Sequence, residues 1–283
     1  MKEVPLTELI ERFQLQQLAA VLEEVQQPCV KGFVGEAPLK IGGSKIGGRP
    51  DVTDDFRWPQ REDKPLAFIA QINLAEINHN LLPPAGMLYF FYDLEVWGFD
   101  PDDAPSVRVI YEEPGGVYNP IRLPTFETKV LFGLKTKHVT PVTFGECRIT
   151  FYDGYSLPSA EDKRLEEFLK DDRLSDQYCD AKEAGTPTVQ MFGYSNPIQQ
   201  DMMQLECQLV TNGLYCGDTS GYENPRALEL AKGKDDWVLL FQLDEHPPSE
   251  MVWGDAGMLY FWIRKQDLAE RRFERTWMIL QCH

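Results

Sequence analysis

The chain reads Phe68-Ile69-Ala70-Gln71-Ile72-Asn73 and, a little further on, Ala85-Gly86-Met87-Leu88-Tyr89-Phe90. It repeats this pattern 171 residues later, as Leu239-Leu240-Phe241-Gln242-Leu243-Asp244 and Ala256-Gly257-Met258-Leu259-Tyr260-Phe261. The second block is identical in both copies over six residues, and the same offset aligns Gln71 with Gln242. Chance does not readily give both matches at one offset, so we infer an internal duplication.

Each copy has the composition of an antiparallel pair of strands. Its runs are short, apolar and aromatic, which is typical of strands. Gly86 and Gly257 precede the second strand, where a glycine supplies a positive φ or lets another backbone approach closely. One strand pair alone is marginally stable, so we expect two pairs to share a core around a pseudo-two-fold axis.

The fold class predicted is mainly β, or β-rich α+β. We expect internally duplicated, roll-like antiparallel sheets with an N-terminal helix and a few surface helices. Residues 1–283 are predicted to form a single domain, with a helical segment at 1–28, a first half at 29–158 and a second half at 159–283. A fainter match supports the halves: Ile46–Pro50 resembles Phe192–Pro197 if one residue is inserted.

Helices are predicted from apolar residues at a 3.6-residue period. The period predicts a helix over 5–26 and another over 159–171, where Ser159 and Asp162 resemble a capping box. Residues 197–209 and 225–232 also have helical spacing. The polar segment 173–190 is predicted to loop outward.

The composition is ordinary for a globular protein, with 43% hydrophobic and 26% charged residues. The net charge is −17. A polyanionic surface repels phosphate backbones and anionic membrane surfaces, so we expect no nucleic-acid partner and no membrane partner. The acidity favours either a solvated surface with no partner or a basic partner protein.

The N-terminus has no basic start followed by an apolar stretch, so we expect no signal peptide. The chain contains no run of about 18 apolar residues, so we expect no membrane span. The six cysteines are sparse and irregularly spaced, which is typical of a reduced, cytoplasmic protein.

Gln71 and Gln242 lie among apolar neighbours, and a buried amide must be hydrogen-bonded. The simpler interpretation is that each pairs with backbone at equivalent places in the two halves. The functional interpretation places Gln71, Asn73, Gln242 and Asp244 around a cleft at the pseudo-axis.

Motifs for catalysis or cofactors are missing. Gly42–Gly48 is not a phosphate-binding loop, because Gly48 stands where that motif needs lysine. No Cys-x-x-Cys pair and no zinc-binding histidine motif occurs, so we expect no metal and no cofactor. The acidic loop around Asp100 matches no calcium-loop pattern and favours a solvated turn, although metal use there stays open.

The loop from Met251 to Gly257 is the best candidate for exposed function. Trp253 beside Asp255 can stack on and hydrogen-bond a small polar ligand or a peptide, with Trp58 as a second aromatic wall. The simpler interpretation is that both tryptophans anchor the core beneath turns, as tryptophan usually does.

Three functions remain open. The leading one is a non-enzymatic binding or interaction protein, with a basic protein as a conceivable partner. The second is a hydrolase-like enzyme with paired carboxylates, Asp244 and Asp255, in a cleft between the halves. The third is peptide or carbohydrate binding by exposed Trp58 and Trp253.

With these motifs in hand, the chain resembles the YwqG-like family of uncharacterised bacterial proteins. The matching stretches are Ser44–Pro50, Trp58-Pro59, Pro65–Leu74, Leu81–Tyr92, Val107–Tyr111, Gly193-Tyr194, Leu239–Asp244 and Trp253–Ile263. The resemblance implies a mainly β, roll-like fold with a few helices. It implies no catalytic residues.

Overall fold

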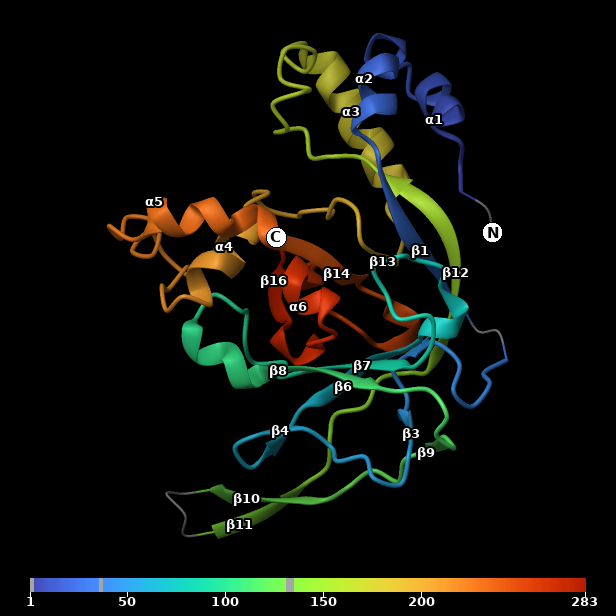
Figure 1. The fold of residues 1–283 in the computed structure, drawn as a ribbon, viewed down its shortest axis with the longest axis vertical. Helices are drawn as coiled ribbons and strands as arrows, with labels where there is room; N and C mark the ends of the chain where they lie inside the picture. The colour runs from blue at the N-terminus through green and yellow to red at the C-terminus, as the bar shows by residue number, and fades with distance from the viewer. Residues whose placement is uncertain (1–2, 36–37, 131–134) are drawn as a thin grey trace.

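The computed structural model describes residues 3–35, 38–130 and 135–283 (Figure 1). The strands are β1 (Gln27–Gly35), β2 (Lys45–Ile46), β3 (Asp51–Val52), β4 (Gln60–Arg61), β5 (Lys64–Pro65), β6 (Ala67–Asn73), β7 (Met87–Tyr92), β8 (Val107–Glu112), β9 (Asn119–Pro120), β10 (Phe126–Val130), β11 (Lys135–Val139), β12 (Cys147–Ser156), β13 (Val189–Met191), β14 (Trp237–Asp244), β15 (Met258–Arg264) and β16 (Trp277–Gln281).

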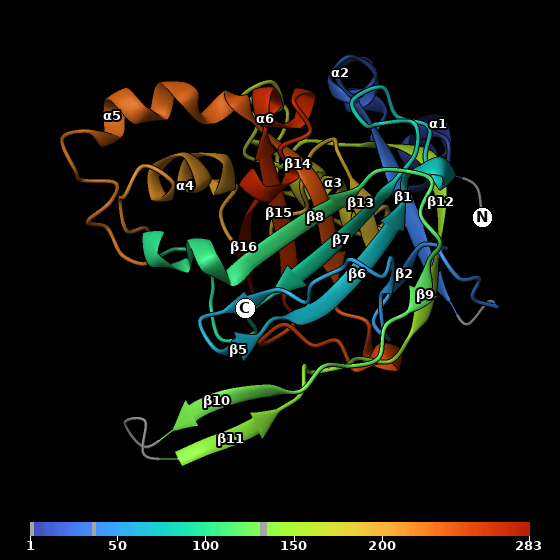
Figure 2. The same cartoon turned by 60° about the horizontal axis from the view of Figure 1, so that its bottom comes forward.

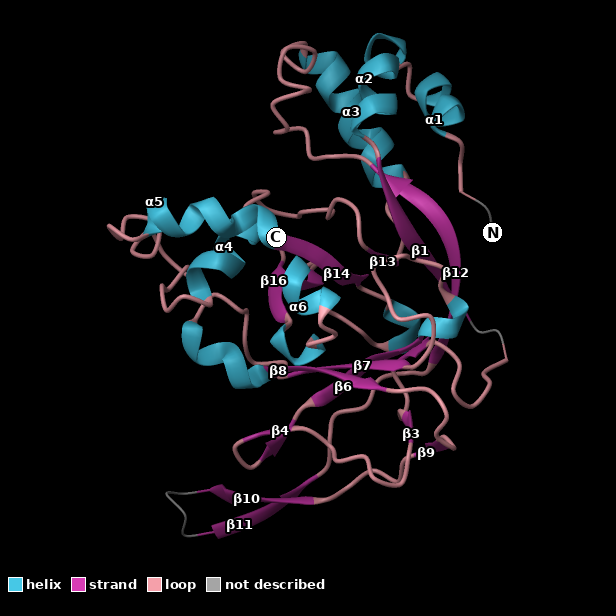
Figure 3. Cartoon of the chain, viewed as in Figure 1, coloured by secondary structure: helices cyan, strands magenta, loops and turns pink. Residues whose placement is uncertain are grey.

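The helices are α1 (Leu6–Arg12), α2 (Ala19–Val25), α3 (Asp172–Ala184), α4 (Met203–Val210), α5 (Ala227–Leu230) and α6 (Lys265–Ala269). Short 3₁₀ turns are η1 (Gln16–Leu18), η2 (Leu74–Glu76), η3 (Pro101–Ser106), η4 (Ala231–Asp236), η5 (Pro247–Ser249) and η6 (Phe273–Arg275). Figure 3 shows α1, α2 and α3 grouped at one end of the molecule and α4 with α5 on one flank. The protein is therefore strand-rich with a few peripheral helices, as predicted.

The main sheet has a symmetric strand order. It runs β16-β15-β14-β13-β1-β12-β2-β6-β7-β8. Reading outward from the central pair β1 and β12, β13 matches β2, β14 matches β6, β15 matches β7 and β16 matches β8. All ladders in this sheet are antiparallel. The strand order therefore has the pseudo-two-fold symmetry that the repeat predicts, with its axis between β1 and β12.

The two repeated strand pairs share their register. Gln71 on β6 lies opposite Tyr89 on β7, and Gln242 on β14 lies opposite Tyr260 on β15. Both ladders are also irregular at the same place, between Phe68 and Ala70 and between Leu239 and Phe241. A β-bulge that recurs at one position of both copies is a designed feature of the strand rather than a defect.

The aligned glycines differ in conformation between the two copies. Gly86 has φ +115°, a conformation that side chains other than glycine's rarely adopt. Gly257 is not in that region, but a Cβ there would meet the Trp253 carbonyl oxygen at 1.8 Å. Both positions leave no room for a Cβ, since one at Gly86 would meet the Glu112 carbonyl oxygen at 2.7 Å, but only Gly86 is also required by its conformation.

The central core lies between the two curved halves of the sheet. Phe90 of β7 contacts Phe241 and Phe261 of the second half, with ring centroids 4.5 and 5.1 Å apart. A second apolar cluster lies between α4 and β14–β16, and a third joins α1, α2 and α3. The first half's outer face packs under the loops that include Trp58. Figure 2 shows β6–β8 crossing in front of β14–β16.

The upstream match between the halves needs no inserted residue. Lys45 lies opposite Gln71, and Gln190 lies opposite Gln242. Gly47 and Gly48 lie two and three residues after Lys45 and have φ +63° and +67°. Phe192 and Gly193 lie two and three residues after Gln190 and have φ +62° and +70°. Gly47 therefore corresponds to Phe192. Four residues further along each half, Asp51 corresponds to Asn196.

The helix predicted over 5–26 is interrupted. It divides into α1 and α2 because the chain turns at Gln14, which has φ +57°. The helices expected within 197–209 and 225–232 are present as α4 and α5, each shorter than predicted.

The helix predicted over 159–171 is wrong, and so is the loop over 173–190. Ser159 Oγ accepts from the Glu161 N–H and Asp162 Oδ1 from the Arg164 N–H, so local turns compete with helix there. The helix is α3, whose N-terminus is capped by Asp171 at the Leu174 N–H (2.9 Å).

Strands β10 and β11 pair antiparallel and project from the body (Figure 2). The apolar run Val130–Leu134, whose composition predicts a strand, begins at the end of β10 and otherwise lies outside the described residues.

Candidate functional site

In each half, a buried glutamine and a buried tyrosine bind the backbone N–H and the backbone carbonyl of one residue. Gln71 Oε1 accepts from the Asp51 N–H at 2.7 Å, and the Tyr89 hydroxyl donates to the Asp51 carbonyl at 2.7 Å. In the second half, Gln242 Oε1 accepts from the Asn196 N–H at 3.2 Å, and Tyr260 donates to the Asn196 carbonyl at 2.6 Å. We call this arrangement the Gln–Tyr clasp. It confirms that both glutamines pair with backbone at equivalent places.

The first clasp is closed by the chain's own backbone. The Gly42 N–H donates to Asp51 Oδ2 at 2.9 Å, and Asn73 Nδ2 donates to the Gly42 carbonyl at 2.7 Å. Gln71 Nε2 also donates to Asp51 Oδ2, at 3.0 Å. Lys45, only 3% exposed, forms an ion pair with Asp51 at 3.1 Å. The polar atoms around Asp51 are therefore satisfied from within.

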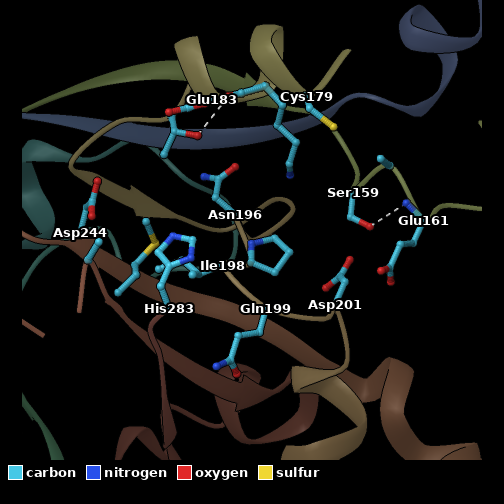
Figure 4. A pocket seen from close by; sticks show the side chains of 16 residues that line it. Ser159, Glu161, Cys179, Glu183, Asn196, Ile198, Gln199, Asp201, Asp244 and His283 are labelled. Carbon is cyan, nitrogen blue, oxygen red and sulfur yellow. Dashed lines mark hydrogen bonds between the residues drawn. The ribbon is translucent and has the colours of Figure 1, made fainter. Parts of the chain in front are cut away.

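The second clasp is open. Gln242 Nε2 and Asn196 Nδ2 are buried and have no hydrogen-bond partner among the described residues. Because α3 leads into β13 here, the turn that carries Gly42 in the first half has no counterpart. A cavity of about 750 Å³ lies beside Asn196 instead (Figure 4). Its lining is Ser159, Ala160, Glu161, Cys179, Lys182, Glu183, Thr186, Asn196, Pro197, Ile198, Gln199, Asp201, Asp244, Ala256, Met258 and His283.

The amide and the carboxylate exchange places between the halves. Asp51 and Asn73 flank Gly42 in the first half, whereas Asn196 and Asp244 stand at the same positions beside the cavity. In Figure 4, Asn196 lies between Asp244 on one side and Asp201 on the other. The cavity therefore offers an amide donor with carboxylate acceptors to either side.

The charged groups of the cavity have shifted pKa values. Burial lowers the pKa of Lys182 to about 8, although its Nζ donates to the carbonyls of Leu157 and Ser195 at 3.0 Å each. Burial raises the pKa of Asp244, against the hydrogen bond it accepts from the Glu245 N–H. Burial also raises the pKa of Asp201, while the charge on Lys182 lowers it. Perturbed groups converging on one cavity are typical of binding and active sites.

The two glutamines should differ in what they contribute to stability. Gln71→Leu removes hydrogen bonds to Asp51 and Gly43 and leaves their buried polar groups unpaired, so we expect a loss of about 2 kcal/mol in the free energy of unfolding. Gln242→Leu removes one hydrogen bond and an unpaired donor, so its cost should be below about 1 kcal/mol. Urea denaturation of both variants checks this difference. Equal costs would contradict the distinction between closed and open clasps.

The residues predicted to share a cleft at the pseudo-axis do not do so. Gln71 lies on the face of β6 that packs outward under the first half's loops, and Gln242 lies on the opposite outer face, toward α4. Asn73 caps η2 through the Ala75 N–H at 3.0 Å. Of the four residues, Asp244 alone lines the cavity of about 750 Å³.

The hypothesis that Trp58 and Trp253 form exposed walls of a binding groove is wrong, and the simpler interpretation, that both anchor the core, is confirmed. Trp58 is 7% exposed and donates to the Leu66 carbonyl at 2.9 Å. Trp253 is 2% exposed, and its ring packs against Phe144 with centroids 5.7 Å apart. Both indoles cover apolar strand residues beneath turns, so they anchor the core and form no groove.

The carboxylate pair is not formed either. Asp255 is exposed on its loop, where its carbonyl accepts from the His283 N–H, and it does not line the cavity. The hydrolase hypothesis thus loses one of its two named acids.

Three residues that line the cavity were not predicted as site residues from the sequence, namely Lys182, Asn196 and Asp201. Asn196 could have been found from the sequence, because the upstream match over Phe192–Pro197 contains it. Lys182 and Asp201 belong to segments without a motif, and only the placement of α3 beside the end of β13 brings them together.

Within 3–35, 38–130 and 135–283, the structure places no three His, Cys, Asp or Glu side chains where they would hold a metal ion. Asp100 instead accepts from the Asp102 N–H at 2.9 Å, as in a local turn. None of the described helices has the length and apolar character needed to cross a bilayer.

The symmetric sheet and its two clasps define the chain as an internally repeated, β-rich protein. It belongs to the family described as Domain of unknown function (DUF1963), whose model matches residues 44–282. This membership agrees with an uncharacterised family, and closer kinship with YwqG stays an expectation. The curated proteins contain no match to this chain.

Proposed function

We propose that this chain is a non-enzymatic binding protein whose second half holds a small polar ligand in the cavity beside Asn196. The observation that carries the proposal is the contrast between the clasps. In the first half the N–H and the carbonyl of Gly42 fill the place between Asp51 and Asn73. In the second half that place is a cavity, lined by Asn196, whose Nδ2 has no hydrogen-bond partner among the described residues.

The first half also indicates which groups a ligand needs. Gly42 offers one N–H to a carboxylate and one carbonyl to an amide. Because the two side chains are exchanged in the second half, a ligand there would offer a carbonyl or carboxylate oxygen to Asn196 and an N–H to Asp244. Lys182, which also lines the cavity, adds positive charge, and an amino acid or its amide carries both an oxygen acceptor and an N–H donor.

Binding is favoured over catalysis by the state of the charged groups. Lys182 is held by two backbone carbonyls, which ties α3 to the chain at Leu157 and Ser195 and removes freedom that a nucleophile needs. The hydrolase hypothesis needs Asp244 and Asp255 to face each other, but Asp255 does not line this cavity. A cytoplasmic location stays a prediction.

The test is a binding screen with free amino acids and their carboxamides, followed by thermal shift and by ¹H–¹⁵N NMR. We expect saturable binding that Asp244→Asn weakens by roughly tenfold, since a charge-assisted hydrogen bond is lost. The matched control is Asn73→Asp, which changes the equivalent position of the closed half and should leave binding intact.

A cavity-filling variant completes the test. Cys179→Trp places a large side chain at the cavity wall on the outer side of α3, where the wild-type residue is exposed. It should abolish binding while the far-UV circular dichroism stays unchanged. Saturable binding that survives Cys179→Trp would show that the ligand binds elsewhere and would overturn the proposal.

A further inference from the structure

A second cavity, of about 520 Å³, lies between the first half's loop at 95–103 and the second half's α4. The two sides are joined by the Cys216 N–H, which donates to the Phe99 carbonyl at 2.9 Å. In Figure 1, α4 faces the coil that precedes β8 at this place. The cavity is lined by Glu95, Val96, Trp97, Phe99, Asp100, Asp103, Gln199, Glu206, Tyr215, Cys216 and Gly217.

Two features of this lining are unusual. Trp97 is 49% exposed and Tyr215 is 43% exposed, although aromatic rings of this size are normally covered. The lining also contains four carboxylates and no lysine, arginine or histidine. Glu95 is already paired with Lys64 at 3.0 Å, which leaves Asp100, Asp103 and Glu206 as carboxylates without an ion pair among the described residues. Exposed aromatic residues next to such carboxylates are the composition of a cation-binding site.

Glu206 supplies the independent observation. It is 8% exposed, and one carboxylate oxygen accepts from the Tyr222 hydroxyl at 2.9 Å. Its other oxygen, Oε2, is buried without a hydrogen-bond partner in the described part of the chain. A buried carboxylate with one free oxygen is costly unless a donor or a cation completes it. Asp201 increases the cost, since its negative charge raises the pKa of Glu206 further.

We propose that this cavity binds a guanidinium group, with Trp97 and Tyr215 as its aromatic walls and Glu206 as its buried counter-charge. A guanidinium fits better than an ammonium, because it is planar, stacks on aromatic faces and carries several donors in a fixed fork. Asp100 and Asp103 at the cavity wall add negative charge, and the net charge of −17 steers a cation toward the protein. The group can belong to a free small molecule or to an arginine of a basic protein segment.

The test is calorimetric titration with N-acetylarginine amide against N-acetylcitrulline amide, which has the same shape without the charge. We expect the arginine compound to bind at least about tenfold more tightly. Glu206→Gln and Trp97→Ala should each weaken it by about tenfold or more, and Trp97→Phe, which keeps a ring, by less. The matched control is Phe168→Ala, an exposed aromatic residue (40%) that does not line this cavity.

The source of the guanidinium is decided in the same titration. An arginine-containing peptide that binds well above the amide supports a basic protein partner, and equal affinities support a free small molecule. Equal binding of the arginine and citrulline compounds, or no binding of either, overturns the proposal. Melting curves of every variant show whether a loss of binding reflects a loss of fold.

Discussion

Phe90→Ala is expected to destabilise the whole chain by about 4 kcal/mol and to do so in a single transition. Phe90 is fully buried in the first half, yet its ring packs on Phe241 and Phe261 of the second half. The deletion leaves a cavity at the junction of the two half-sheets, where neither half can close it alone. Both halves should therefore lose stability together.

The measurement is urea denaturation followed by far-UV circular dichroism and by tryptophan fluorescence. Trp237, Trp262 and Trp277 report mainly on the second half, although the substitution is in the first. A double-mutant cycle between Phe90→Ala and Phe241→Ala should give a coupling energy of about 1 kcal/mol, and one between Phe68→Ala and Phe241→Ala should give almost none. Two separate transitions, of which one is unaffected, would contradict the proposal that residues 1–283 form one domain.

The sequence was informative wherever the two copies could be compared. An apolar run with a glutamine at a fixed place predicts a buried amide, and the strand pairing and the clasps follow from it. Burial also explains why the tryptophans misled. A tryptophan beside glycine and aspartate is compatible with a groove or with a core anchor, and local sequence contains nothing on what covers the ring.

The sites were predictable only in part, because they depend on what the rest of the chain places beside the clasp. The closed clasp needs the turn at Gly42, and the open one exists because α3 approaches instead. That helix was missed, since Ser159 and Asp162 have a helix-capping spacing but form local turns. Glu206 was missed because its burial depends on Tyr222, which lies sixteen residues further along the chain.

Glu206→Gln should stabilise the protein at neutral and alkaline pH. Burial raises the pKa of Glu206 from 4.5 to about 7. Between these two values the folded chain holds a proton that the unfolded chain has released, so folding stability falls as the pH rises through this window. The stability that protonated Glu206 provides is complete below pH 4.5 and is lost above pH 7. Glutamine stays neutral throughout and keeps an acceptor for Tyr222.

Counted from its value at acid pH, the difference between variant and wild type should therefore grow from about 0.8 kcal/mol at pH 5 to about 3 kcal/mol at pH 8. Comparing the two proteins at each pH cancels the titration of the groups that do not interact with Glu206. Tyr222 and Cys216 do interact with it, but burial raises their pKa values far above this pH range, so Asp201 is the coupled group that contributes to the difference. Urea denaturation at steps between pH 5 and 8 measures it, with Glu229→Gln at an exposed position as the control that should show no trend. A difference that does not change with pH would mean that Glu206 is ionised in the folded protein at all these values. The informative outcome is a difference in unfolding free energy that rises with pH, together with loss of guanidinium binding in Glu206→Gln. It would mean that the buried carboxylate lowers stability at neutral pH and is retained because it binds a cation.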